Sequence, residues 1–154
     1  MVLPDLDGES GYLPGGTHDA SLEEIRARYA TNFRRREIFA GLEHVLKLLA
    51  ARGVKTVWVD GSFITSKARP SDVDLIYVSP SGSDPDTWDW LSQTRRPDLK
   101  KYHRVDLWRY PSPQRSKKNT LSRKITIKEF FESDEDDTSK GIIHLIGWND
   151  DQEQ

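Results

Sequence analysis

Two aspartates near the middle of the chain have the residue type and spacing of metal ligands. Asp72 and Asp74 lie two residues apart at the start of an apolar run, residues 73–78. In a strand, residues two apart project from the same face and are separated by about 7 Å. Carboxylates held this close repel each other, and a cation between them relieves the repulsion. Their hard oxygen atoms suit Mg²⁺ or Mn²⁺.

A second apolar run precedes the aspartates, and a polar loop joins the two runs. Residues 56–60 read Thr-Val-Trp-Val-Asp and are followed by Gly61-Ser62, and the loop then contains Lys67. Glycine lets the backbone approach a phosphate closely, and serine and lysine can donate hydrogen bonds to it. The pattern predicts strands at 56–60 and 73–78 joined by a loop large enough to hold a phosphate. For Lys67, an exposed loop lysine without a ligand is an equally good interpretation.

The order of Gly61-Ser62, a short spacer and Asp72-Val73-Asp74 resembles the signature of the nucleotidyltransferase superfamily that includes DNA polymerase beta. The stretches 60–67 and 70–74 also look like a group of small uncharacterised bacterial and phage proteins in that superfamily. This likeness extends from residues 13–18 to residues 140–143. It implies a single-domain α/β (α+β) fold, a mixed central sheet with helices mainly on one face.

Asp106 is a third acidic candidate. Residues 102–110 alternate with a period of two and predict a strand in which Asp106 lies between Val105 and Leu107. An unpartnered carboxylate in apolar surroundings is costly. The resemblance implies a third acid on a neighbouring strand, and Asp106 matches it by position. A salt bridge to Arg104 or Arg109 is the competing explanation.

The resemblance also implies a reaction, the transfer of a nucleoside monophosphate from a nucleoside triphosphate to a hydroxyl acceptor. Asp72 and Asp74 would bridge two Mg²⁺ or Mn²⁺ ions, and Asp106 would complete the ion on the acceptor side. The nucleotide-binding residues would be Gly61, Ser62 and Lys67. Small members of the superfamily often belong to toxin–antitoxin or phage-defence pairs. The alternative is a catalytically silent copy of the fold that acts as a binding, regulatory or antitoxin-like partner.

Length and composition narrow the class of protein. A chain of 154 residues predicts one domain with its own core, and the absence of cysteine excludes disulfides and thiolate chemistry. No apolar run is long enough to span a membrane, and the N-terminus lacks the pattern of a signal peptide, so we expect a cytoplasmic protein. The expected organisation is an N-terminal arm at 1–19, the domain at 20–148 and a polar tail at 149–154.

Charge is distributed unevenly along the chain. The formal net charge is −2, but residues 95–128 contain twelve Lys or Arg and two acidic residues, a local net charge of +10. Such a segment favours a polyanionic acceptor such as RNA or tRNA. The resemblance also allows a protein or small-molecule acceptor, and a protein partner. The alternative is a solvated surface balanced by the acidic remainder of the chain.

Helices must position these strands. Residues 21–24 read Ser-Leu-Glu-Glu, a capping box that predicts a helix to about Tyr29. A longer helix from residue 31 or 32 to residue 52 follows, with apolar residues at helical spacing. Its first turn contains Arg34, Arg35 and Arg36, which fit solvated surface better than contact with a phosphate or partner. Further helices are predicted at 86–93 and 126–133, a basic loop at 111–123 and a last strand at 141–148.

Overall fold

A five-stranded sheet forms the centre of the structure, which is a computed structural model describing residues 3–110 and 141–149. The strands are β1 (Thr17–Ser21), β2 (Val57–Asp60), β3 (Val73–Val78), β4 (Val105–Tyr110) and β5 (Ile142–Ile146). They lie in the order β1-β5-β2-β3-β4. β1 is parallel to β5 and β3 to β4, whereas β2 is antiparallel to both of its neighbours. The sheet is therefore mixed, as predicted.

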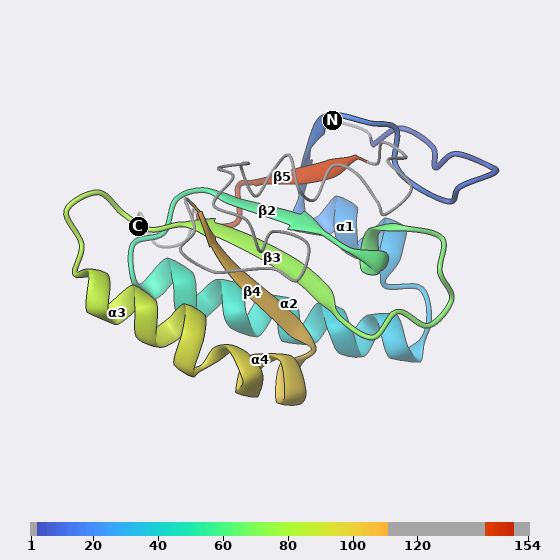
Figure 1. Ribbon diagram of the computed structural model, residues 1–154. Helices are drawn as coiled ribbons and strands as arrows, with labels where there is room; N and C mark the ends of the chain where they lie inside the picture. Colours follow the sequence, from blue (N-terminus) through green and yellow to red (C-terminus); the bar gives the residue numbers. More distant parts are fainter. Residues whose placement is uncertain (1–2, 111–140, 150–154) are drawn as a thin grey trace, which may run out of the picture.

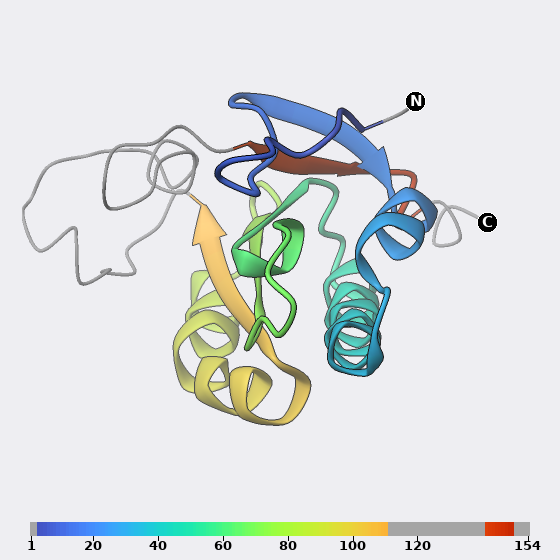
Figure 2. The same cartoon turned by 90° about the vertical axis from the view of Figure 1, so that its right-hand side faces the viewer.

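The helices lie mainly on one side of this sheet (Figures 1 and 2). They are α1 (Leu22–Tyr29), α2 (Phe33–Ala51), α3 (Pro85–Asp89) and α4 (Arg96–His103), with a single π turn at Trp90–Thr94 between α3 and α4. The parallel pair β3 and β4 needs a crossover connection, and α3, the π turn and α4 supply it. The predicted α+β class, with helices mainly on one face, is confirmed.

The two N-terminal helices begin and end at the residues that the sequence indicates. Ser21 and Glu24 form the reciprocal capping box of α1. At the start of α2 the Asn32 side chain accepts a hydrogen bond from the Arg35 amide at 2.9 Å. After α2 ends, Gly53 adopts a left-handed conformation with φ +84°. Residues with a side chain rarely adopt this conformation, so the glycine suits the end of the helix. α2 is thus fixed at both ends beneath the sheet.

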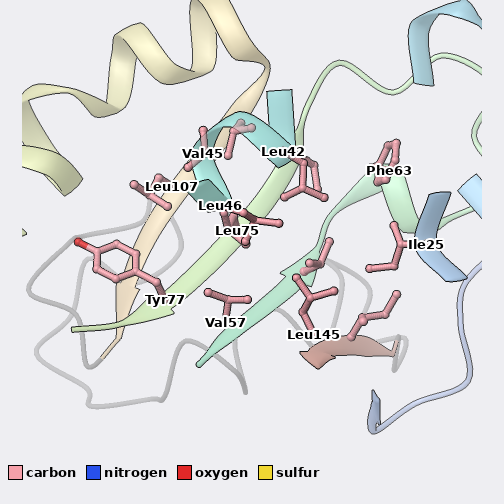
Figure 3. Close-up of a cluster of buried hydrophobic side chains, with 14 of the residues drawn as sticks. Ile25, Leu42, Val45, Leu46, Val57, Phe63, Leu75, Tyr77, Leu107 and Leu145 are labelled. Carbon is pink, nitrogen blue, oxygen red and sulfur yellow. The ribbon is translucent and has the colours of Figure 1, made fainter. Parts of the chain in front are cut away.

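The main hydrophobic core lies between the sheet and α2. Leu42 and Leu49 of α2 and Leu75 of β3 are fully buried. Figure 3 shows side chains of α2 facing those of β2, β3 and β4, with Phe63 and Ile25 at one end of the cluster. This packing sets which face of each strand points away from the helices, because side chains alternate along a strand.

The segment expected to be an N-terminal arm contributes to the sheet. Thr17–Ser21 is an edge strand parallel to β5, and Leu3 and Leu13 are buried in the main core. The expected arm ended at residue 19, so its last three residues belong to β1, whose partner strand lies more than 100 residues away in the chain. Local sequence patterns carry no information on such a pairing.

The strand predicted from residue 102 begins later. Residues 96–103 form α4, Arg104 adopts a left-handed conformation with φ 58°, and β4 starts at Val105. Pro97 in the first turn of α4 is compatible with a helix start. The predicted basic loop at 111–123, the helix at 126–133 and most of the tail at 149–154 lie outside the described residues. Among the described helices, none has the length and apolar character to cross a membrane.

Candidate functional site

Three aspartates are aligned across neighbouring strands on the sheet face that points away from α2. Asp74 pairs in register with Asp60 of β2 and with Asp106 of β4. We call Asp60, Asp74 and Asp106 the carboxylate row. Leu75 follows Asp74 and Leu107 follows Asp106, and both leucines belong to the main core. Because side chains alternate along a strand, the carboxylate row lies on the opposite face of the sheet. Asp72 shares the parity of Asp74 and immediately precedes β3.

Two cations of α4 contact these acids. Arg96 Nε lies 2.8 Å from Asp106 Oδ1, and the Arg96 guanidinium stacks on the Trp108 ring at 3.8 Å from its centroid. Lys100 Nζ lies 3.7 Å from Asp72 Oδ2 and 3.9 Å from Asp106 Oδ2. Arg96 and Lys100 are one helical turn apart, so one face of α4 presents both charges to the acids.

The salt bridge considered for Asp106 therefore exists, but with other partners than Arg104 or Arg109. Arg104 pairs with Glu37 at 3.1 Å, and Arg109 pairs with Asp89 at 2.6 Å. The sequence suggested arginines close to Asp106 in the chain as its partners. In the fold, its partners are cations of the preceding helix α4. A structural ion pair and a metal ligand are both compatible with an acid in this position.

Burial raises the pKa of the Asp72 carboxyl above its usual value, and the charge of Asp106 raises it further. Lys100 and Lys67 act in the opposite direction. Lys67 is thus close enough to influence Asp72, although its side chain is exposed. The ionised Asp72 is destabilised at this place, which is the condition that a bound divalent cation would relieve.

Gly61 adjoins the carboxylate row. Its φ of +93° and ψ of −173° are accessible almost only to glycine. A Cβ atom added there would lie 2.6 Å from Asp74 Oδ2. Asp74 Oδ1 accepts a hydrogen bond from Trp108 Nε1 at 3.3 Å. The missing side chain of Gly61 therefore provides the space that the Asp74 carboxylate uses.

Side-chain hydrogen bonds from α2 hold the loop after Gly61. Ser62 begins a short 3₁₀ helix, Ser62–Ile64, and its carbonyl accepts from the Thr65 hydroxyl at 2.7 Å. Arg35 donates to the carbonyls of Phe63 and Thr65 at 2.5 and 2.7 Å. The prediction of solvated surface is wrong for Arg35, which is 4% exposed, whereas Arg36 is exposed.

The donor set has the chemistry of a magnesium or manganese site, and its backbone placement brings Asp72, Asp74 and Asp106 to one end of one sheet face. The carboxylates of Asp72 and Asp106 contact cations of α4, and that of Asp74 accepts from Trp108. Among residues 3–110 and 141–149, no three acidic or histidine side chains converge closely enough to hold an ion. The residues fit such an ion in type, their backbone positions share one sheet face, and Lys100 lies within 4 Å of both the Asp72 and the Asp106 carboxylates.

A groove lies beside the loop, between the start of α2 and Arg104. Its volume is about 460 Å³, and Phe33, Arg34, Arg69 and Arg104 line it together with Glu37. Phe33 is 77% exposed. Three arginines against one glutamate give this groove a positive character.

In the described part of the basic segment, residues 95–110, most cations are already paired with acidic side chains. Five of its six described cations, all except Lys101, form ion pairs with acidic side chains: Arg95, Arg96, Lys100, Arg104 and Arg109. The remainder of the segment, 111–128, lies outside the described residues. In the groove, Arg34 and Arg104 share the single carboxylate of Glu37, so the groove keeps a net positive charge.

Sequence reasoning missed Asp60, Arg35 and the two cations of α4. Asp60 ends β2 with the parity of Trp58, opposite to the core residues Val57 and Val59, and this alternation was a usable signal. Arg35 precedes Ile38, Phe39 and Leu42 by three, four and seven positions, so it belongs to the buried stripe of α2. For Arg96 and Lys100 the sequence offers no comparable signal.

Comparison with known proteins gives a family and no function. The chain matches none of the curated proteins and none of the solved structures with which it was compared. Residues 4–146 match the model of a family described as a family of unknown function, DUF6932. This match covers β1 to β5, including every acid and loop residue of the candidate site. The chain belongs to the DUF6932 family.

Proposed function

We propose that the protein is a metal-dependent nucleotidyltransferase that moves a nucleoside monophosphate from a nucleoside triphosphate to a hydroxyl acceptor. The observation that carries the proposal is the register of the sheet. Asp74 and Asp106 are direct neighbours on parallel strands, Asp72 shares their face, and Gly61 abuts Asp74. Ion pairs with Arg96 and Lys100 account for Asp106 and Asp72, and a raised carboxyl pKa beside a glycine-containing loop supports a functional role in addition.

Asp72, Asp74 and Asp106 would hold Mg²⁺ or Mn²⁺. Bound there, a divalent ion supplies charge neutralisation to the attacking and leaving oxygens. The acceptor oxygen forms a bond to the α-phosphorus, the bond from that phosphorus to the leaving oxygen breaks, and pyrophosphate departs. We assign to Asp106 the removal of the acceptor proton. Gly61, Ser62 and Lys67 would bind the phosphates of the donor.

The acceptor that the surface favours is an RNA end. The groove beside the loop combines Arg34, Arg69 and Arg104 with the exposed ring of Phe33, and cations with an aromatic ring suit a single-stranded nucleic acid. Arg104 also donates to the carbonyl of Ser71, the residue before Asp72, at 3.4 Å. The groove thus adjoins the backbone that leads into Asp72. A protein hydroxyl is the second acceptor class.

The test uses the full chain with each α-labelled nucleoside triphosphate, Mg²⁺ or Mn²⁺, and a cell extract that contains RNA and protein. Asp74→Asn and Asp72→Asn remove one carboxylate charge each with little change in shape. Asp19→Asn is the matched control, because Asp19 lies on the edge strand β1 and contacts His144 at 3.0 Å. We expect label on one macromolecule with the wild type and Asp19→Asn, and a loss of at least about 1,000-fold with the two site variants.

Three results would favour other interpretations. Wild-type protein that binds Mn²⁺ and nucleotide but transfers no label would favour a catalytically silent, regulatory copy of the fold, such as an antitoxin-like partner. Label transfer that survives both site substitutions would show that the acids serve only as ion-pair partners of Arg96 and Lys100. A label that appears on protein and not on RNA would move the acceptor away from the groove.

A further inference from the structure

The first turn of α2 holds the loop that follows Gly61 through its backbone carbonyls. We call residues 61–70 the glycine–serine loop. Arg35 donates to the carbonyls of Phe63, Thr65 and Lys67, and to that of Tyr29 at 3.4 Å. A planar guanidinium with five fixed N–H donors can bridge several acceptors in this way. One buried side chain thus fixes three alternate residues of the loop.

Two neighbours of Arg35 extend this arrangement to the end of the loop. The Asn32 amide donates to the carbonyl of Ala68 at 2.9 Å, and Arg34 Nη1 donates to the carbonyl of Pro70 at 3.3 Å. Five carbonyls of the glycine–serine loop therefore accept from three side chains at the start of one helix. Pro70 leads directly to Ser71 and Asp72, so the same contacts also set the approach to β3.

The charge of Arg35 is unusual for a buried side chain. Its four acceptors are carbonyl oxygens, and no carboxylate pairs with it among residues 3–110 and 141–149. Burying a guanidinium without a counter-ion is costly, even where its N–H groups are satisfied by carbonyls. Burial accordingly lowers the pKa of Arg35. An anion bound on the outer side of the loop would offset part of this cost through the added attraction.

We infer that Arg35 is a positioning residue that shapes the glycine–serine loop for a triphosphate and places a buried positive charge behind it. The inference rests on the proposed function and names the ligand class of the loop, a metal-bound polyphosphate independent of the base. Arg35 touches the loop carbonyls and acts through the loop. Its loss weakens polyphosphate binding, whereas the divalent ion held by the acids is bound as before.

The test measures two ligands separately by calorimetry, Mn²⁺ alone and inorganic triphosphate in the presence of Mn²⁺. Arg35→Lys keeps the charge and loses the multiple carbonyl contacts, and Arg36→Lys is the matched control because Arg36 is exposed. We expect Arg35→Lys to weaken triphosphate binding about tenfold and Mn²⁺ binding less than twofold, since several hydrogen bonds from a charged group are lost. Arg36→Lys should bind both ligands as the wild type does.

Hydrogen exchange of the loop amides gives a readout that does not depend on a ligand. Arg35→Lys should speed exchange at residues 61–70 and leave β4 and β5 unchanged. Arg34→Met serves as a milder variant if Arg35→Lys does not fold, because it removes the Pro70 contact alone from the loop. It should weaken triphosphate binding about threefold, as expected from one lost hydrogen bond.

Three outcomes overturn the inference and are distinguishable from one another. If the wild type binds Mn²⁺ and triphosphate and Arg35→Lys binds triphosphate equally well, Arg35 has no positioning role and the proposed function stands. If the wild type binds Mn²⁺ but no triphosphate, both the inference and the donor part of the proposed function are wrong. Equal weakening of Mn²⁺ and triphosphate binding would show a general loss of structure in place of a specific role.

Discussion

Leu75 and Asp74 are neighbours on β3 and face opposite sides of the sheet. Leu75 is fully buried and packs with the core residues of α2 (Figure 3). Asp74 aligns with Asp60 and Asp106 on the other face, at the end where α4 brings Arg96 and Lys100. One face stabilises the fold by apolar burial, and the other gathers charges that burial disfavours. Substitutions on the core face should therefore change mainly stability, and substitutions on the acid face mainly the proposed function.

The largest expected change in stability comes from the core face. Leu75→Ala should lower the free energy of unfolding by about 2–5 kcal/mol, because it removes buried methyl groups and leaves a cavity. Asp74→Asn on the same strand should change it far less and abolish transfer. Chemical denaturation of both variants measures this difference. Equal destabilisation by the two substitutions would mean that the acid face is as structural as the core.

Gly61→Ala should affect both the stability of the fold and the binding of a metal ion by the acids. The backbone conformation at Gly61 costs alanine about 1–3 kcal/mol, and the new Cβ atom would displace the Asp74 carboxylate. We expect lower stability together with weaker Mn²⁺ binding. Gly16→Ala is the matched control, because Gly16 also has a positive φ, +98°, and a Cβ atom there would meet nothing within 4 Å. Weaker Mn²⁺ binding by both variants would rule out a specific role for the space at Gly61.

Lys100→Met should strengthen Mn²⁺ binding about tenfold, or about 1.4 kcal/mol. Lys100 lies within 4 Å of Asp72 and Asp106 and competes with a divalent ion for the same carboxylates. Lys101→Met, at the neighbouring exposed position, should leave Mn²⁺ binding unchanged. Calorimetric titration at low ionic strength measures both constants. Unchanged or weaker Mn²⁺ binding by Lys100→Met would contradict the placement of the ion between these acids.

The smallest effect is the dependence of stability on pH. Because the pKa of Asp72 is raised on folding, the folded chain binds this proton more tightly than the unfolded chain. Ionisation of Asp72 as the pH rises above the usual carboxyl value of 3.8 therefore costs stability. Asp72→Asn should be slightly more stable than the wild type at pH 7, and the gain should vanish below pH 3.8. A variant that is less stable at pH 7 would contradict the direction of this pKa shift.

Local patterns predicted the elements that carry the site. The capping box of α1, the course of α2 and the strands β2 and β3 follow from residue types at fixed spacing. The shared face of Asp72 and Asp74 follows from the period of a strand alone. These predictions succeeded because each depends on neighbours in the chain.

The rest of the site depends on contacts between distant segments. β1 is a strand only because β5 pairs with it, and α4, with mostly polar residues, is recognisable only by its packing. The same holds for the partners of Asp106, since Arg96 and Lys100 reach it only once α4 packs beside β4. Arg35 could have been placed in the buried stripe of α2, but its carbonyl acceptors in the glycine–serine loop could not.

The most direct measurement of the central claim compares two positions of the label in the same nucleoside triphosphate. The wild type is incubated with Mg²⁺ or Mn²⁺, an RNA-containing extract, and donor labelled at either the α- or the γ-phosphorus, beside Asp74→Asn. Nucleotidyl transfer predicts that the α label reaches the acceptor, that the γ label leaves in pyrophosphate, and that Asp74→Asn yields neither. Transfer of the γ label to the acceptor, or no label on any macromolecule, would contradict it.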